Sequence, residues 1–256
     1  MLFDTHAHLD DPQFDEDREQ VIQSLRDYGV GNVTNIGASM ETSRQAVALA
    51  NQYDFIYATV GVHPGEVDEL TEQDMQELKN LVLNNPKVRA IGEIGLDYHY
   101  EDADPDEQQF WFRRQLKLAE ELSMPVVIHD RDSKGKCIEI LEEMDVRNGV
   151  MHCFSGSAET ARKLVDMGFM ISFTGVLTFK NARRAVEACQ AVPLERLMVE
   201  TDCPYMAPEP HRGTRNFSGY VKYVAEKMAE IKGVSYEEIV RITTENAMRF
   251  YQIKNV

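Results

Sequence analysis

Eight short runs of aliphatic and β-branched residues alternate along the chain with stretches of helical periodicity, and this alternation limits the fold more than any other feature. The stretches between the runs carry apolar side chains at the three- and four-residue spacing of amphipathic helices. Eight strand–helix repeats within 256 residues predict a single (β/α)8 barrel, an α/β fold, forming one domain over residues 1–256. The strand-like runs cover residues 2–7, 31–36, 56–61, 88–94, 125–129, 149–152, 170–174 and 197–200.

An open, doubly wound parallel sheet is the alternative fold. The glycine-rich phosphate-binding motifs that usually accompany that fold follow none of the strand-like runs. After the eighth run come two more helical stretches, 221–231 and 236–251, and Ser235 with Glu238 has the spacing of a capping box that opens the second. The longest irregular segment, residues 202–217, is expected to be a loop that acts as a lid or contacts substrate.

The composition excludes several classes of protein. The net charge of −16 disfavours binding along extended stretches of nucleic acid, although it leaves room for a local cationic site. No apolar run is long enough to cross a bilayer, and the first residues lack the pattern of a secretory signal, so we expect a cytoplasmic protein with no membrane partner. The four cysteines form no C-x-x-C pair, so we expect them to be reduced, with Cys153 and Cys203 as small buried fillers.

Polar side chains gather where the strand-like runs end. His6 and His8 close the first run, and residues two apart on a strand point to the same face, so the two imidazoles can grip one ion. Five of the seven histidines lie at such ends, together with two acidic residues. In a closed barrel these carboxyl ends meet at one mouth, where barrel enzymes place their active sites. The full set is His6, His8, His63, Glu93, His129, His152 and Asp202.

A single histidine at the end of a strand is more often a hydrogen-bonding loop residue than a metal ligand. Gathering several imidazoles and carboxylates at one rim costs a few kcal/mol for each desolvated group unless something satisfies them. The joint pattern therefore indicates a metal site, whereas His99 is interpreted as a surface residue.

The same segments resemble the TatD family of metal-dependent hydrolases, a branch of the amidohydrolase-like barrels. The similarity extends over nearly the whole chain, from residue 2 to residue 250. Seven motifs in order carry it: DTHAHL (4–9), GVHP (61–64), GEIGLDY (92–98), PVVIHDRD (125–132), HCFSG (152–156), TFKNA (178–182) and ETDCPY (200–205).

The resemblance implies two divalent ions at the barrel mouth. The first ion would be held by His6, His8 and Asp202, and the second by His129 and His152, with Glu93 bridging the two. Asp202 would also take a proton from a metal-bound water, whose pKa the ions lower. Histidine and carboxylate ligands accept Zn²⁺, Mn²⁺, Fe²⁺ or Ni²⁺, and a loosely held Mg²⁺ is also compatible with catalysis.

Five further residues are candidates for substrate or supporting roles. Glu200, on the strand face shared with Asp202, is expected to orient the water or a ligand. His63 either contacts the substrate phosphate or fixes a ligand carboxylate, and Arg131 pairs either with a phosphate or with Asp97. Arg212 and Arg215 are candidate phosphate contacts, although the segment 211–218 departs from the family pattern at Thr214 and at 217–218.

The predicted function is hydrolysis of a phosphodiester. The resemblance implies a metal-dependent deoxyribonuclease, most closely a 3′–5′ exonuclease on the ends of single-stranded DNA or a related phosphodiesterase, with no obligate protein partner. The alternative is an amidohydrolase or esterase such as a D-aminoacyl-tRNA deacylase, because the same ions can polarise a carbonyl. Many binuclear amidohydrolases use a strand-four lysine as the bridge; residues 88–97 contain Glu93 and no lysine, which favours the TatD-like reaction. A third possibility, a binding protein without catalysis, predicts lost ligand positions, and all six are present.

Overall fold

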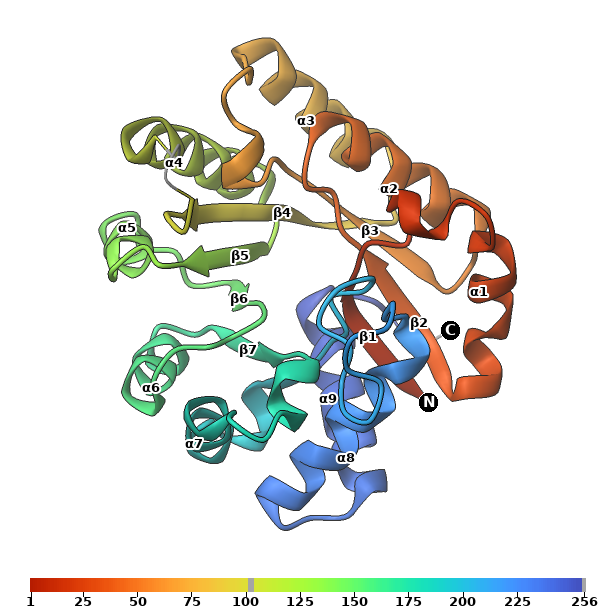
Figure 1. Cartoon of the computed structure of the whole chain (residues 1–256). Coiled ribbons are helices and arrows are strands. Elements are labelled where there is room, and N and C mark those ends of the chain that lie inside the picture. The colour runs from red at the N-terminus through yellow and green to blue at the C-terminus, as the bar shows by residue number, and fades with distance from the viewer. Residues whose placement is uncertain (101–103, 255–256) are drawn as a thin grey trace. The chain divides into compact units, whose positions relative to one another are not determined.

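The computed structural model of the chain describes residues 1–100 and 104–254. Eight strands are hydrogen-bonded in the order β1-β2-β3-β4-β5-β6-β7-β8, and helices separate them along the chain (Figure 1). The strand pairs are parallel wherever their register is defined, for example between β4 and β5. This sequential parallel order with intervening helices is the predicted (β/α)8 fold.

By their internal contacts the described residues divide into two compact units. The first comprises Met1–Asn35, His152–Asp166 and Met170–Val256, and the second comprises Ile36–Met151 and Met167–Phe169. Within these residues, no helix has the length and apolar character needed to span a bilayer. The assignment of residues 1–256 to one domain stays a prediction.

In the first unit, helices α8 and α9 pack against the strands β1 and β8. The six residues of β1 are all buried, including the polar residues Asp4, Thr5 and His6. The elements of this unit are β1 (Leu2–Ala7), η1 (Pro12–Phe14), α1 (Arg18–Ser24), η2 (Leu25–Tyr28), β2 (Val30–Asn35), α6 (Ala158–Asp166), β7 (Met170–Phe173), η4 (Gly175–Thr178), α7 (Arg183–Ala191), η5 (Leu194–Arg196), β8 (Leu197–Val199), η6 (Ser218–Tyr220), α8 (Val221–Lys232) and α9 (Tyr236–Phe250).

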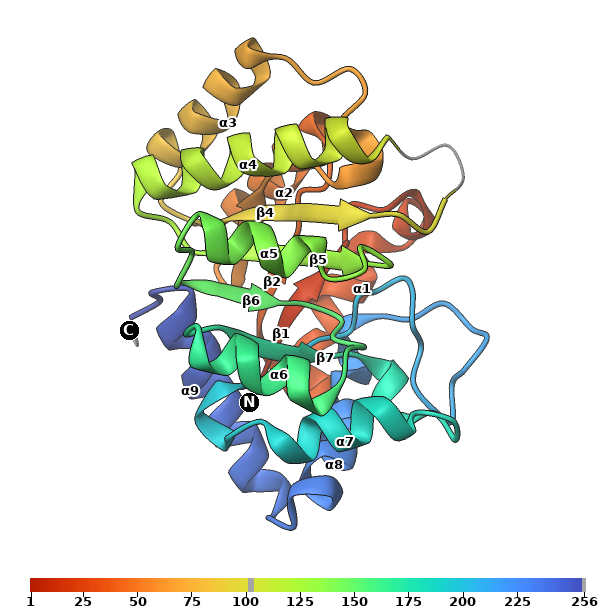
Figure 2. The same cartoon turned by 90° about the vertical axis from the view of Figure 1, so that its left-hand side faces the viewer.

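In the second unit, α2 packs against β3 and α4 packs along β4 (Figure 2). The apolar positions of α4 include Trp111, Phe112 and Leu116, which are buried, while Phe110 on the same helix is exposed. The elements of this unit are α2 (Met40–Gln52), β3 (Ile56–Val60), η3 (Pro64–Glu66), α3 (Glu72–Asn84), β4 (Val88–Asp97), α4 (Pro105–Leu122), β5 (Val126–Arg131), α5 (Lys136–Glu143) and β6 (Gly149–Met151).

Strands β4 and β5 are longer than the sequence predicts. The periodicity ends the fourth run at residue 94 and the fifth at 129, but the pairing continues through Gly95↔His129 to Asp97↔Arg131. The extension depends on Gly95, because a Cβ on this residue would overlap the carbonyl oxygen of His129. Gly95 also has φ +151°, a conformation that side-chain-bearing residues rarely adopt. Asp97 therefore belongs to the strand and not to the following loop.

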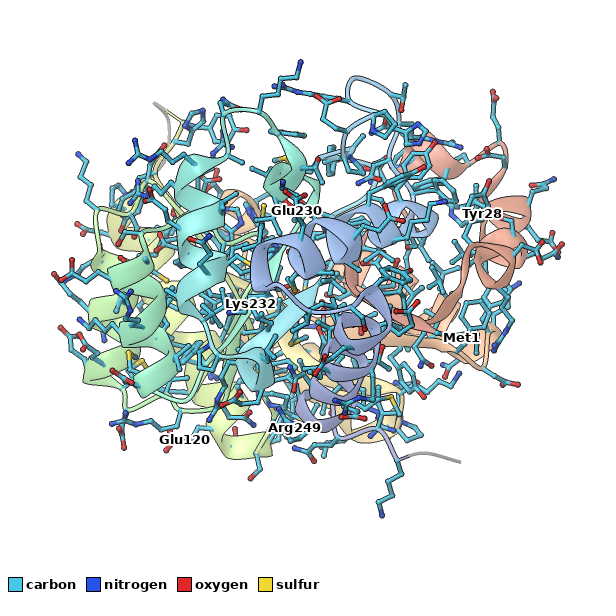
Figure 3. The ribbon with its side chains drawn as sticks, turned by 90° about the horizontal axis from the view of Figure 1, so that it is seen from below. Met1, Tyr28, Glu120, Glu230, Lys232 and Arg249 are labelled. Carbon is cyan, nitrogen blue, oxygen red and sulfur yellow. The ribbon has the colours of Figure 1, made fainter. Side chains whose placement is uncertain are left out.

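The helix boundaries follow local signals in the sequence. Ser235 accepts a hydrogen bond from the backbone N–H of Glu238 at the start of α9, and Gly233 ends α8 in the left-handed region. Lys232, labelled in Figure 3, donates to the carbonyls of Cys189, Gln190 and Val192 at the end of α7. A cation at this position satisfies carbonyls that have no partner within the helix.

Residues 202–217 form the irregular segment that the sequence predicts. In Figure 2 this light blue segment lies beyond the arrowhead of β1. Two contacts tie it to the segment that follows β1. Tyr205 donates its hydroxyl to Asp11, and Arg215 makes two bonds to the Asp17 carboxylate.

Cys137, Cys153, Cys189 and Cys203 are free thiols in the structure. Cys203 is fully buried, whereas Cys153 is only partly so.

Candidate metal centre

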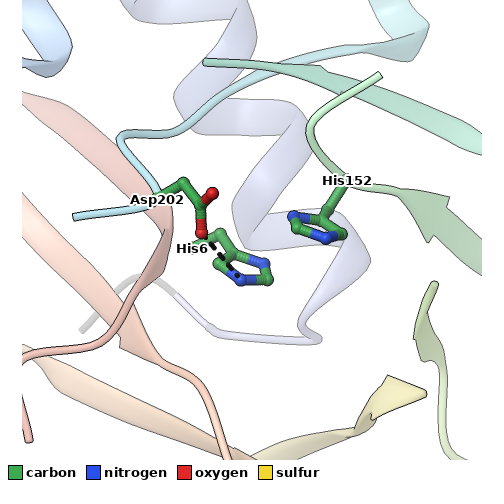
Figure 4. A group of neighbouring side chains, drawn as sticks. All are labelled: His6, His152 and Asp202. Atoms are coloured by element: carbon green, nitrogen blue, oxygen red, sulfur yellow. Dashed lines mark ion pairs between the residues drawn. The ribbon is translucent and has the colours of Figure 1, made fainter. Parts of the chain in front are cut away.

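The first cluster joins the end of β1 to the segment after β8. Figure 4 shows His6, His152 and Asp202 facing one another. Oδ1 of Asp202 lies 3.6 Å from Nε2 of His6 and 3.5 Å from Nε2 of His8. The two Nε2 atoms are 3.2 Å apart, which confirms that His6 and His8 point to the same face. The rings of His6 and His152 stack with centroids 4.0 Å apart.

These separations fit donor atoms that surround one ion. Nitrogen and oxygen ligands bind a first-row divalent ion at about 2.0–2.2 Å, so two ligands of a tetrahedral ion lie about 3.3–3.6 Å apart. The three donor–donor distances among His6, His8 and Asp202 are 3.2, 3.5 and 3.6 Å. Neutral imidazoles and a carboxylate are also the donor types that such ions prefer. The first cluster can therefore hold a divalent ion without rearrangement.

Backbone pairing fixes these donors in place. The N–H of Asp202 donates to the carbonyl of His6, and the N–H of His8 donates to the carbonyl of Cys203. The buried Asp4 carboxylate accepts from the backbone N–H and the hydroxyl of Thr201. Burial raises the pKa of Asp4 to about 7 in spite of these bonds. The strand that carries His6 thus also anchors the residue before Asp202.

Asp202 is poised to stay ionised. Burial raises the pKa of its carboxyl, but the hydrogen bond with His8 and the charges of His6 and His152 outweigh burial, so the pKa lies below its ordinary value. Asp202 also has φ 58°, an uncommon backbone conformation for a residue other than glycine. A carboxylate held in this way can bind a cation or accept a proton.

Glu200 lies next to His152. One oxygen of the fully buried Glu200 carboxylate lies 3.4 Å from Nδ1 of His152 and accepts a 2.6 Å hydrogen bond from the N–H of Cys153. A carboxylate on one ring nitrogen fixes the tautomer and leaves the other nitrogen to bind an ion. The structure therefore gives Glu200 a supporting position behind His152. Its predicted part in orienting a water stays a prediction.

The second cluster lies at the ends of β4 and β5, in the other unit. Nδ1 of His129 is 2.8 Å from an oxygen of Glu93, and its Nε2 is 3.2 Å from an oxygen of Asp97. His63 approaches the same Glu93 oxygen at 3.9 Å through Nε2, while its Nδ1 accepts from the N–H of Gly65. His63, Asp97 and His129 together also have the spacing of a possible ion site.

Asp97 is the residue whose role sequence reasoning missed. It was considered only as a partner of Arg131, but its carboxylate contacts His129 and accepts from the backbone N–H of His99. Burial raises the pKa of Asp97, but the contacts with His129 and His99 outweigh burial, so the pKa of this carboxyl lies below its ordinary value. The available signal was its position four residues after Glu93, which puts both side chains on one face of a strand.

The candidate substrate-contact residues have protein partners of their own. The Arg131 guanidinium lies over the Tyr100 ring, 5.5 Å from its centre. Among the described residues, Arg131 therefore contacts an aromatic ring and does not pair with Asp97. Arg212 lies 4.3 Å from the centre of the Phe179 ring. Arg215 stacks on Phe14 at 4.7 Å in addition to its bonds to Asp17, which gives it a structural role. Substrate contact by these three arginines stays a prediction.

The structure thus brings the predicted residues together within each unit. His6, His8, His152, Glu200 and Asp202 form the first cluster, and His63, Glu93 and His129 belong to the second. His99 is exposed as expected and pairs with Asp132 at 2.8 Å.

Known proteins resemble this chain over nearly its whole length. A family model described as TatD related DNase matches residues 3–252. The metal-dependent hydrolase YabD of Bacillus subtilis is 46% identical over 255 residues, which cover 99% of this chain and 100% of that protein. The metal-dependent hydrolase YcfH of Escherichia coli K12 is 38% identical over 258 residues, covering 99% of this chain and 96% of YcfH.

A solved structure has the same fold. YjjV, a TatD homologue from Escherichia coli K12, superposes with a TM-score of 0.94 at 31% sequence identity, covering 99% of this chain and 98% of that one. The likeness confirms the predicted fold class and the resemblance on which the ligand assignments depend.

Proposed function

The chain belongs to the TatD family of metal-dependent hydrolases, and from that premise we propose that it is a divalent-metal-dependent deoxyribonuclease, an exonuclease that degrades single-stranded DNA from the 3′ end. The observation that carries the proposal is the convergence of His6, His8 and Asp202 at ligand–ligand distances. The description of the matching family as TatD related DNase supports the choice of DNA as substrate.

We assign six residues as ligands of two divalent ions, following the family resemblance. In this assignment His6, His8 and Asp202 would hold one ion, His129 and His152 would hold the other, and Glu93 would be a ligand of both. When bound, such ions polarise the phosphoryl group and lower the pKa of a coordinated water. Supporting evidence comes from the donor spacing in the first cluster and from the 2.8 Å contact between His129 and Glu93 in the second.

Other side chains are proposed to accept a proton, to orient the ligand rings and to contact substrate phosphates. Asp202 is the proposed proton acceptor, because its lowered pKa keeps the carboxylate ionised and therefore able to take a proton. Glu200 and Asp97 fix the ring orientations of His152 and His129. His63, Arg131 and Arg212 are the proposed contacts to substrate phosphates. Few phosphate contacts on a chain of net charge −16 suit a short single-stranded end better than a long duplex.

The experiment uses protein stripped with a chelator and reloaded with Mg²⁺, Mn²⁺, Zn²⁺ or Ni²⁺ in separate reactions. The substrates are a 5′-labelled single strand, the corresponding duplex, and D-aminoacyl-tRNA. We expect a ladder that shortens from the 3′ end of the single strand with at least one ion and no cleavage by the stripped protein. The duplex should be cut more slowly.

Two variants make the assay specific to the proposed site. Glu93→Ala should abolish cleavage with little loss of fold, and His99→Asn, which changes an exposed histidine, should leave cleavage unchanged. Deacylation of the tRNA adduct without DNA cleavage would replace the proposal by the esterase alternative. Equal cleavage by the Glu93→Ala protein would show that the activity does not come from this site.

A further inference from the structure

Tyr205 presents an exposed aromatic ring beside the first ligand cluster. Tyr205 is 50% exposed to solvent. It follows the ligand Asp202 by only three positions. The ring lies 6.4 Å from the His8 ring, measured between centroids, at an interplanar angle of 65°. Large aromatic rings are usually buried, so one that stays half open to solvent at the edge of a reaction centre is positioned to meet a ligand.

Three hydrogen bonds hold this ring in place. The backbone N–H of Tyr205 donates to the carbonyl of Asp202, and its own carbonyl accepts from the side chain of Asn216. The hydroxyl donates to Asp11 at 2.8 Å. A ring fixed at both ends loses little conformational entropy when a ligand packs on it, which favours binding.

The surroundings of Tyr205 select an uncharged aromatic partner. The hydroxyl is already engaged by the Asp11 carboxylate, so the ring face is the surface that remains for recognition. The negative charge of Asp11 opposes a phosphate at this position. Met206, the next residue, is 42% exposed and extends the apolar surface.

We propose that Tyr205, with Met206 beside it, is the stacking platform for the terminal nucleobase of the strand that is being degraded. The inference rests on the proposed nuclease function and adds a subsite to it. Bases stack on aromatic rings in a manner that tolerates any sequence, because every base has a π-face. A platform here would hold the 3′-terminal nucleotide against the metal ligands His8 and Asp202 without reading its identity.

The test compares two single-stranded substrates with three forms of the protein. One oligonucleotide ends in an ordinary 3′ nucleotide, and the other carries an abasic 3′-terminal residue with the same phosphates. Tyr205→Phe retains the ring but loses the bond to Asp11, whereas Tyr205→Leu removes the ring and keeps much of its volume. Phe110→Leu on α4 is the matched control, because it removes another exposed aromatic ring.

We expect Tyr205→Leu to lower kcat/KM for the ordinary substrate by on the order of 10-fold, which is the scale of one base–aromatic stack. The same variant should process the abasic substrate as the wild type does, and Tyr205→Phe should stay within about 2-fold of wild type on both substrates. If Tyr205→Leu does not fold, wild-type protein decides, since it should then cleave the ordinary end about 10-fold more efficiently than the abasic end.

Different results would contradict the stacking inference and the proposed nuclease function. Equal losses on both substrates, or a Tyr205→Phe protein as impaired as Tyr205→Leu, would show that the residue acts by bonding Asp11 and not by stacking. Wild-type protein that cleaves neither oligonucleotide with any ion would contradict the nuclease proposal, and the stacking inference would fall with it. Active wild-type protein with an unaffected Tyr205→Leu variant would contradict the stacking inference alone.

Discussion

The Glu200 carboxylate lies 3.4 Å from Nδ1 of His152 and is fully buried behind it. The same oxygen accepts from the N–H of Cys153, so one carboxylate bonds the backbone after β6 and lies beside the histidine ring. An acidic residue in this position raises the basicity of the imidazole and fixes the nitrogen that it offers to an ion.

Replacing Glu200 by Gln should weaken metal binding without removing a ligand. We expect a 10- to 100-fold loss of affinity for the divalent ion, the usual effect of losing such a partner. Isothermal titration of the stripped protein with Zn²⁺ or Mn²⁺ measures it. Glu195→Gln, an exposed change in the same unit, is the control. Unchanged affinity in Glu200→Gln would mean that His152 needs no orientation or is not a ligand.

Asp202→Asn should separate metal binding from the rate of reaction. The amide oxygen can still ligate an ion, but it cannot accept the proton that we assign to the carboxylate, so kcat should fall by a factor of about 10² or more. Metal content measured beside the cleavage assay distinguishes the two effects. A variant that retains both its metal and its rate would remove Asp202 from proton transfer.

Gly95→Ala should disrupt the second cluster through the backbone. Its new Cβ would overlap the carbonyl oxygen of His129, so we expect a loss of more than about 3 kcal/mol in the free energy of unfolding. Gly213→Ala is the matched control: it also has positive φ, but nothing lies within 4 Å of its Cβ. The control should lose only the conformational cost of about 1–2 kcal/mol. Urea denaturation measures both, and equal losses would show that the close approach of β4 to β5 is unimportant.

The pair formed by Asp17 and Arg215 should make stability depend on pH in a defined range. The hydrogen bond from Arg215 lowers the pKa of the Asp17 carboxyl below its ordinary value of 3.8. The contribution is therefore complete above pH of about 4 and is lost as the pH falls through the lowered pKa. Both side chains are partly exposed, so the pair should contribute no more than about 1 kcal/mol.

Urea denaturation of wild type and Asp17→Asn at a series of pH values tests this linkage. The difference between the two proteins should be constant from pH 7 to pH 5 and should shrink below pH 4. High salt should reduce it at every pH, because exposed charges are screened. A difference that is the same at pH 3 as at pH 7 would show that the ion pair does not stabilise the fold.

The alternation of strands and helices was sufficient to predict the fold, because the strand-like runs are rich in aliphatic and β-branched residues and the stretches between them are periodic at the helical spacing. The first ligand cluster was also predictable: His6 and His8 share a strand face by their spacing alone, and the structure places their Nε2 atoms 3.2 Å apart. The approach of Asp202 to them followed from the predicted barrel, which brings the carboxyl ends of the strands to one mouth, whereas its assignment to the same ion depended on the family resemblance.

What the sequence could not supply was the choice among partners. Arg131 and Asp97 sit on paired positions of β5 and β4, so an ion pair was a reasonable expectation. In the structure the carboxylate of Asp97 contacts His129, and the guanidinium of Arg131 lies over Tyr100. Likewise, the sequence made Arg215 a candidate phosphate contact, and in the structure it bonds Asp17 and stacks on Phe14. Such choices depend on side-chain packing between distant segments, which no local pattern encodes.

The central claim is that His6, His8 and Asp202 bind one divalent ion, and anomalous diffraction tests it most directly. Crystals soaked in Mn²⁺ or Zn²⁺ should show a strong anomalous peak about 2.0–2.2 Å from Nε2 of His6, from Nε2 of His8 and from a carboxylate oxygen of Asp202. The Asp202→Asn protein should retain the peak, because the amide oxygen can still ligate the ion. The contradicting result is a map with no peak at these three donors, obtained with an ion that activates the same protein in the cleavage assay.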